Sequence, residues 1–248
     1  MNTSQQASSA VLVPGHWLGA WAWDGVAEHL SQAGVPTVAL TLPGLDPQDP
    51  ERASRTVEDQ ARAIEAALEG AAPGQEGAVL VVHSGGNWPA SVVLDRRPDL
   101  VRHVVWVDSG PVAPGQVFAP DAPDDLTEFP LPAFEQLGAQ ASLDGLGAEQ
   151  LETFRQRAVP EPGPVLRQAV ALEDDDARFS VPTTIVCCSI ASAQLRELAG
   201  AGHPMFSEVT RLGQVDFVDL PTGHWPMWSR PGDLAEVIAG VVAASADA

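Results

Sequence analysis

Short apolar runs rich in β-branched residues alternate with segments of helical apolar spacing along most of this chain. Such alternation is typical of a parallel β-sheet with helices on both faces, because parallel strands are usually joined by a helix. The expected strands are 10–14, 37–42, 78–82, 103–107, 183–189 and 215–220, and the expected helices are 21–33, 57–68, 88–97, 192–199 and 232–244. We therefore predict an α/β fold, a mostly parallel doubly wound sheet, and 248 residues suffice for one large core.

One section interrupts this alternation. Residues 111–180 are rich in Pro, Gly and acidic residues, with only weakly helical stretches at 150–159 and 164–172. A loop of this length without structure of its own is uncommon inside a compact domain. We expect an inserted helical cap at 111–180, with residues 1–110 and 181–248 forming the core.

A possible nucleophile lies where the expected strand 78–82 ends. His83-Ser84-Gly85-Gly86 follows this strand and precedes a helix. A serine on a sharp strand-to-helix turn, with small neighbours, matches the G-x-S-x-G nucleophile elbow, although Val82 replaces its first glycine. The alternative is an ordinary strand-to-helix connection.

Composition excludes several classes of partner. A net charge of −20, from 13 basic and 33 acidic residues, argues against nucleic acid and anionic membranes. No apolar run is long enough to span a membrane, and residues 1–10 lack the features of a signal peptide. Adjacent Cys187 and Cys188 should point to opposite faces of a strand and stay reduced, so we expect a cytoplasmic location.

The segment VLVPGHWLGAWAW, residues 11–23, together with the elbow and the order of elements, resembles the α/β-hydrolase superfamily over nearly the whole chain. It is particularly similar to the branch of plant methylesterases and hydroxynitrile lyases, with Pro14 in place of a histidine. The resemblance implies an oxyanion hole built from the backbone N–H groups of His16 and Gly85. The alternative for residues 14–19 is an ordinary Gly-Pro turn with no role in catalysis. Trp21 and Trp23 are expected to be core residues.

The resemblance also places a catalytic histidine on the loop after the last strand, where His224 stands. Imidazole titrates near neutrality, so it can accept the serine proton and return it to a leaving group. The other histidines fit less well. His29 lies on an expected surface helix, His103 begins a strand, His203 lies in a turn, and His83 should point away from the nucleophile.

The acid departs from the common pattern of the superfamily. The loop after the penultimate strand, residues 188–194, contains no carboxylate. Asp108 is the leading substitute because it ends the strand that follows the elbow helix, as in haloalkane dehalogenases, which this arrangement resembles. Two alternatives are a turn-capping role for Asp108 and a dyad without an acid. Asp219 is interpreted as structural.

The substrate is less constrained. Trp17, Trp88 and Trp225 could form an apolar wall around Ser84, although each could equally be core. With no histidine pair at metal-ligand spacing and no Gly-rich phosphate loop, we expect no metal and no cofactor. The predicted function is hydrolysis of a small, largely apolar ester, thioester or lactone through an acyl-enzyme.

Two alternatives to this function stay open. One is a lyase on the same scaffold, although the chain lacks the pocket lysine of the hydroxynitrile lyases that it resembles. The other is a ligand-binding protein with a vestigial site. Fold alone does not separate these possibilities. The expected partner is a small molecule, and the sequence leaves the oligomeric state open.

Overall fold

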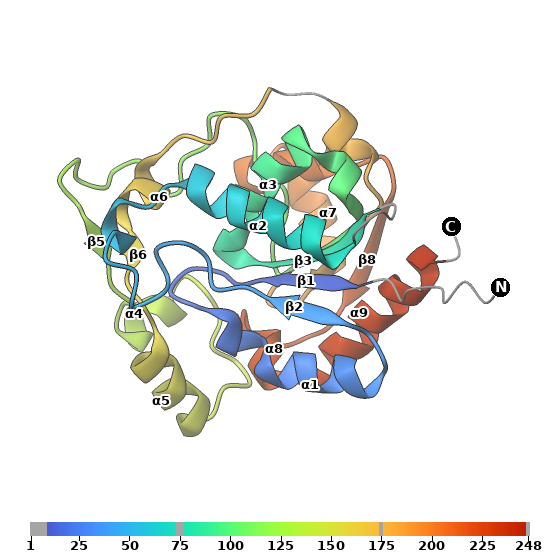
Figure 1. Ribbon diagram of the computed structural model, residues 1–248, viewed down its shortest axis with the longest axis horizontal. Coiled ribbons are helices and arrows are strands. Elements are labelled where there is room, and N and C mark those ends of the chain that lie inside the picture. The colour runs from blue at the N-terminus through green and yellow to red at the C-terminus, as the bar shows by residue number, and fades with distance from the viewer. Residues whose placement is uncertain (1–8, 73–76, 174–175, 247–248) are drawn as a thin grey trace.

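A computed structural model describes residues 9–72, 77–173 and 176–246, so most of the N-terminal stretch 1–10 lies outside the described residues. A six-stranded parallel sheet, in the order β2-β1-β3-β4-β7-β8, forms its centre (Figure 1). The strands are β1 (Ala10–Val13), β2 (Thr37–Ala39), β3 (Ala78–His83), β4 (Val101–Val107), β7 (Thr183–Cys187) and β8 (Val215–Asp219). The predicted α/β fold class is therefore confirmed.

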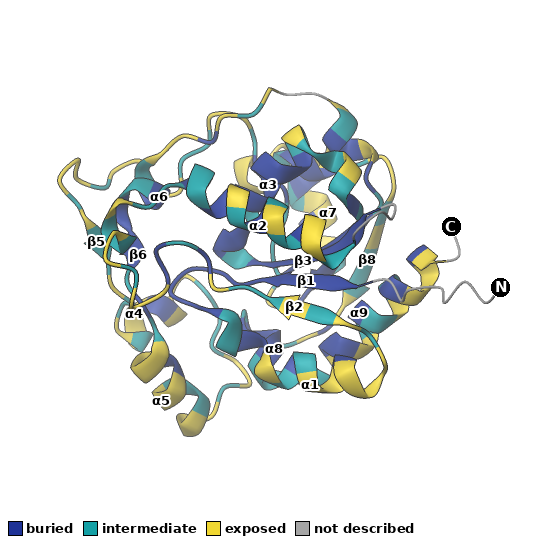
Figure 2. Ribbon diagram, viewed as in Figure 1, coloured by how far each residue is buried: buried dark blue, intermediate teal, exposed yellow. Residues whose placement is uncertain are grey.

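Helices cover both faces of this sheet, as Figure 1 shows for α2 and α3 on one side and α1, α8 and α9 on the other. The helices of the core are α1 (Asp24–Gln32), α2 (Val57–Ala71), α3 (Asn87–Arg96), α7 (Ser192–Gly200), α8 (Pro226–Ser229) and α9 (Pro231–Ala246), with short 3-10 helices at η1 (Ala20–Trp23), η2 (Arg52–Ser54), η3 (Ser84–Gly86), η4 (Pro98–Leu100) and η6 (Pro204–Arg211). Figure 2 shows the buried central strands β1 and β3 between helices whose outer faces are exposed.

Strand residues alternate between two apolar layers because successive side chains of a strand point to opposite faces. Val11 and Val82 pack in the layer with α2, α3 and α7, whereas Leu12 and Val81 pack in the layer with α1 and α9. The two cysteines follow the same rule: Cys187 lies in the first layer and Cys188 in the second, and both are buried free thiols.

Some boundaries differ from those predicted. The expected helix 21–33 is divided into η1 and α1, because Ala22 N–H bonds to Gly19 C=O in a 3-10 turn. β2 ends at Ala39 rather than 42, since after the bond from Leu40 N–H to Leu12 C=O the chain leaves the sheet. Tertiary contacts at the sheet edge decide such boundaries more than local propensity does.

The 111–180 segment contains its own small elements. These are β5 (Glu128–Phe129), α4 (Phe134–Gly138), α5 (Ala148–Arg157), β6 (Glu161–Pro162), α6 (Gly163–Arg167) and η5 (Asp176–Ser180), with β5 and β6 paired antiparallel. Most of them lie together at one end of the molecule, on the left in Figure 1. That this segment acts as a cap stays a prediction.

The strand order creates one natural position for a site. β1 is flanked by β2 and β3, so the direction of chain progression across the sheet reverses between β1 and β3. Ligands of open α/β sheets bind in the crevice beyond the carboxyl ends of the strands at such a reversal. The turn after β1 and the serine after β3 both lie at this position.

Candidate active site

Ser84 occupies the sharp turn between β3 and α3. Its φ of 48° lies in the left-handed region, which a non-glycine residue seldom adopts outside constrained sites. Close packing behind the turn requires a glycine: a Cβ on Gly86 would lie 2.6 Å from the Pro14 carbonyl oxygen. The chain therefore presents the Ser84 side chain beyond the end of the sheet, as expected of a nucleophile elbow.

His224 reaches Ser84 from the loop that follows β8. Its Nε2 lies 2.8 Å from Ser84 Oγ. Two hydrogen bonds to the His224 backbone place this loop: the His83 side chain donates Nε2–H to the His224 carbonyl at 2.7 Å, and His224 N–H donates to the Ser142 carbonyl at 2.7 Å. Burial lowers the pKa of His83 to about 3, with the nearby His224 contributing, so His83 is a neutral donor.

Asp108 follows β4 and completes the row of hydrogen bonds. Its Oδ2 lies 2.6 Å from His224 Nδ1, so Nδ1–H donates to the carboxylate and Nε2 is left to accept the Ser84 hydroxyl proton. Like Ser84, Asp108 has a positive φ, 45°, which Asp tolerates better than most residues.

The loop without a carboxylate supplies hydrogen-bond donors to Asp108. Cys188 N–H and Ser189 N–H donate to Oδ1 at 3.0 and 2.9 Å, and Ser189 Oγ–H donates to Oδ2 at 2.6 Å. Burial raises the pKa of Asp108, but the hydrogen bonds and charge of His224, followed by those of Ser189, outweigh it and hold this pKa below its ordinary value. The carboxylate is therefore kept ionised.

The competing residues lie elsewhere. His29 is exposed on α1, His203 caps η6 by accepting from Met205 N–H, and His103 bonds to Thr184. Asp219 accepts from both N–H and Oγ–H of Ser192 at the start of α7, a structural role that fits the interpretation from the sequence.

The turn after β1 lies directly against the elbow. A Cβ on Gly15 would be 2.8 Å from Ser84 Cβ, and a Cβ on Gly85 would be 2.2 Å from His16 Nε2. Trp17 N–H donates to Glu161 Oε2 at 3.3 Å, so it is not free to face the nucleophile. This leaves the backbone N–H groups of His16 and Gly85 as the oxyanion-hole candidates; that role stays a prediction.

Aromatic side chains surround this arrangement. The Trp225 ring lies edge-on to His224 at 4.9 Å and also packs on Phe154. Trp17 donates Nε1–H to the Phe129 carbonyl, and Trp88 meets Phe118, a half-exposed residue of the 111–180 segment. Trp17, Trp88 and Trp225 are all buried.

The two tryptophans expected in the core differ from each other. Trp23 is completely buried, whereas Trp21 is only partly buried and stacks on Trp228 at 5.5 Å.

Sequence reasoning missed four residues of this region. His83, Ser189, Phe118 and Glu161 all contact the predicted site residues. Ser189, Phe118 and Glu161 lie on segments with no recognised motif. His83 adjoins Ser84, but from the sequence its side chain is expected to point away from the nucleophile. The absence of an acid in residues 188–194 was the one signal that could have directed attention to Ser189.

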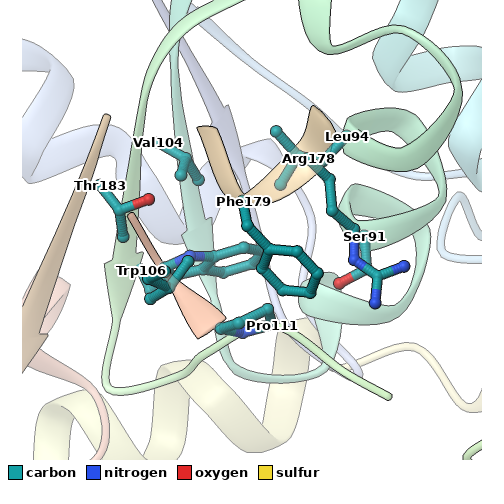
Figure 3. A pocket seen from close by; sticks show the side chains of 9 residues that line it. Ser91, Leu94, Val104, Trp106, Pro111, Arg178, Phe179 and Thr183 are labelled. Atoms are coloured by element: carbon teal, nitrogen blue, oxygen red, sulfur yellow. The ribbon is translucent and has the colours of Figure 1, made fainter. Parts of the chain in front are cut away.

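A small cavity lies away from this arrangement, between α3, β4 and η5 (Figure 3). Its volume is about 10 Å³, and its lining includes Ser91, Trp106, Arg178 and Phe179 but none of Ser84, Asp108 and His224. This space holds about one water molecule, so it is too small for a substrate.

None of the helices in the described residues combines the length and apolar content needed to cross a bilayer. Among the same residues, no three His, Cys, Asp or Glu side chains are grouped to hold a metal ion.

The fold is that of an α/β hydrolase, and the family model described as "Alpha/beta hydrolase family" matches residues 10–237. The chain belongs to this family. The recognition made from the order of elements, the elbow and residues 11–23 is therefore confirmed, together with the prediction of an α/β-hydrolase enzyme.

Similar proteins include methylesterases. The chain is 33% identical to putative methylesterase 14, chloroplastic, of Arabidopsis thaliana over 108 residues, 43% of this chain and 30% of that relative. Among solved structures, an extracellular α/β-hydrolase from a Paenibacillus species superposes with a TM-score of 0.73 at 20% identity, covering 94% of this chain and 98% of that one. The methylesterase MES16 from Arabidopsis gives 0.70 at 19% identity, with coverage of 95% and 99%.

Proposed function

We propose that this protein is a serine hydrolase that cleaves a carboxylic ester, thioester or lactone of a small, largely apolar molecule through an acyl-enzyme. The observation that carries the proposal is the continuous row of hydrogen bonds from Asp108 through His224 to Ser84. A nucleophile, a base and an orienting acid in this geometry are the requirements for covalent acyl transfer.

The first half of the reaction forms the acyl-enzyme. Ser84 Oγ attacks the carbonyl carbon while its proton passes to His224 Nε2, and Asp108 stabilises the resulting imidazolium. The carbonyl oxygen becomes an oxyanion that the N–H groups of His16 and Gly85 bind more strongly than they bind the neutral carbonyl. Collapse breaks the ester C–O bond, and His224 returns the proton to the departing alcohol.

The second half releases the acid. A water molecule gives a proton to His224 and attacks the acyl carbon, forming a second oxyanion in the same position. Its collapse breaks the bond to Ser84 Oγ, which recovers its proton from His224. The carboxylic acid leaves and the enzyme returns to its starting state, so protons balance over the cycle.

The substrate class is supported by the surroundings of Ser84 and by the relatives. Buried tryptophans and Phe118 provide apolar contacts, and 33 acidic residues disfavour a strongly anionic substrate. Two of the similar proteins are named as methylesterases. We propose a neutral, small-molecule ester.

Labelling and turnover with a Ser84→Ala variant test this function. A fluorophosphonate probe and a panel of chromogenic short-chain esters should give labelling and hydrolysis in the wild type and neither in Ser84→Ala. Ser109→Ala is the matched control, because Ser109 donates its hydroxyl proton to the Ser84 carbonyl but lies outside the hydrogen-bonded row. Labelling without turnover would favour a lyase, and a folded protein that shows neither would favour ligand binding.

A further inference from the structure

Glu161 is a buried carboxylate that joins the 111–180 segment to the turn after β1. It lies in β6 and is only 1% exposed. Its Oε2 lies 3.1 Å from His16 Nδ1 and accepts from Trp17 N–H at 3.3 Å, and its Oε1 accepts from Gln60 Nε2–H at 3.4 Å. Burying a carboxylate costs free energy unless hydrogen-bond donors or positive charges compensate for the lost water. The contacts with His16, Trp17 and Gln60 supply this compensation.

The bond to Trp17 holds a strained part of the turn. Trp17 has a φ of 65°, a left-handed conformation that is strained for a bulky side chain and persists only where the surroundings impose it. Both of its backbone groups bond to the 111–180 segment: N–H to Glu161, and C=O to Val159 N–H at 3.0 Å. The segment therefore holds this residue in its left-handed conformation.

The contact with His16 acts on the other side of the same turn. The imidazole lies over Gly85, where a Cβ would come within 2.2 Å of Nε2. His16 Nε2 has no hydrogen-bond partner among the described residues, so the 3.1 Å contact of Nδ1 with the Glu161 carboxylate is the polar contact that orients the ring. Glu161 thus supports His16 directly and Gly85 through the His16 ring.

We propose that Glu161 is a positioning residue for the oxyanion hole. This positioning role rests on the proposed function, because Glu161 positions the backbone N–H groups of His16 and Gly85, which are those assigned to the oxyanion. A misplacement of catalytic groups by about 1 Å costs up to about 100-fold in rate. Loss of Glu161 should therefore lower kcat roughly 10- to 100-fold and change KM little, since the oxyanion forms only after substrate binding.

The test compares Glu161→Gln with Glu128→Gln. Glutamine has a single acceptor oxygen, and Gln60 cannot turn its amide to compensate without losing its bond to the Pro43 carbonyl. Glu128 is the matched control, because it lies on the paired strand β5 opposite Pro162, the neighbour of Glu161, and binds Arg52. Both variants should keep the wild-type circular dichroism spectrum.

Three readouts are measured on both variants. The first is kcat and KM with the best ester of the panel, and the second is the affinity of a trifluoromethyl ketone, which forms an oxyanion on Ser84. The third is amide hydrogen exchange of Trp17, which reports the bond to Glu161 without any chemistry. In Glu161→Gln, kcat and the affinity for the ketone should fall by similar factors, and the Trp17 amide hydrogen should exchange faster. Glu128→Gln should behave as wild type.

Opposing results are distinct for the two proposals. A folded Glu161→Gln protein with wild-type kcat and ketone affinity would overturn the positioning role, as would equal losses in Glu128→Gln. If the wild type hydrolyses no ester and reacts with no probe, the proposed function fails. Hydrogen exchange of the Trp17 amide then still tests whether Glu161 holds the turn. An exchange rate in Glu161→Gln equal to that of the wild type would refute this structural role.

Discussion

Asp108 Oδ2 lies 2.6 Å from His224 Nδ1, although the two residues are 116 positions apart in the chain. The contact forms because β4, which Asp108 follows, is paired with β7, and β7 is paired with β8, which precedes His224. The loop after β7 lies between them and gives Asp108 three hydrogen bonds. An acid placed after β4 therefore reaches the same histidine as an acid placed after β7 would.

Replacing Asp108 by Asn should lower kcat by roughly 10²- to 10⁴-fold with the fold intact. The Asn amide can still accept from Cys188 and Ser189, but it presents N–H to His224 Nδ1 and favours the tautomer that cannot accept the Ser84 proton. Steady-state kinetics with an activated ester measures the loss.

Asp219→Asn is the control for that variant. Asp219 ends β8 five residues before His224, and its bonds go only to Ser192 in the described structure. Its loss should lower the free energy of unfolding only slightly, as for other groups at helix starts, and leave kcat unchanged. Normal activity in Asp108→Asn would remove Asp108 from the mechanism.

His83 should make the stability of the protein depend on pH. Its pKa is about 3 in the folded state against 6.5 for an ordinary histidine, because it is buried. Between these values the unfolded chain binds more protons, so the stabilising contribution is complete above about pH 6.5 and declines as pH falls towards 3. At pH 5 the loss amounts to roughly 2 kcal/mol relative to pH 7.5.

Urea unfolding of wild type and His83→Gln at pH 7.5 and 5.0 measures this dependence. Glutamine retains an N–H donor for the His224 carbonyl but does not titrate. The variant should be less stable at pH 7.5, and its deficit should narrow at pH 5.0. A loss of stability in His83→Gln that is the same at both pH values would show that His83 has the same pKa in the folded and unfolded states.

Replacing Gly85 by Ala should disrupt the site through a steric contact with His16. The new Cβ would lie 2.2 Å from His16 Nε2, a separation that forces the ring or the turn to move. We expect a loss of 1–3 kcal/mol of stability, typical of overpacking, and a marked loss of kcat. His16→Ala should restore stability in the double variant, which a double-mutant cycle by urea unfolding can test.

Gly240→Ala is the matched glycine substitution. Gly240 lies in α9, and a Cβ there meets no atom within 4 Å. Alanine should stabilise this helix by about 0.5–1 kcal/mol and leave activity unchanged. Destabilisation in Gly85→Ala that persists after removal of the His16 ring would contradict the steric explanation.

The two cysteine thiols should resist alkylation in the native protein. Burial raises the pKa of Cys187 to about 12, and it raises the pKa of Cys188 still further. Because the thiolate is the reactive form, iodoacetamide at pH 8 should modify neither until urea unfolds the chain. Mass spectrometry of native and unfolded samples measures this, and rapid native labelling would show that one thiol is accessible.

Local patterns were sufficient to predict most of the fold. Apolar runs bounded by turn residues located the strands, and the family resemblance of residues 11–23 is confirmed by the family match. Boundaries were less predictable: Trp21 begins an apparent helix in the sequence, but in the structure it lies in a 3-10 turn that precedes α1.

The sequence by itself determined the order of strands and helices, the elbow at Ser84 and the loop position of His224, because each depends on residues close together in the chain. Only the tertiary structure decided that Asp108 meets His224 and that Glu161 supports His16, 145 positions away from it along the numbering. The reason is physical: a buried carboxylate takes its role from the donors that the fold brings to it, and neighbouring residues do not specify those donors.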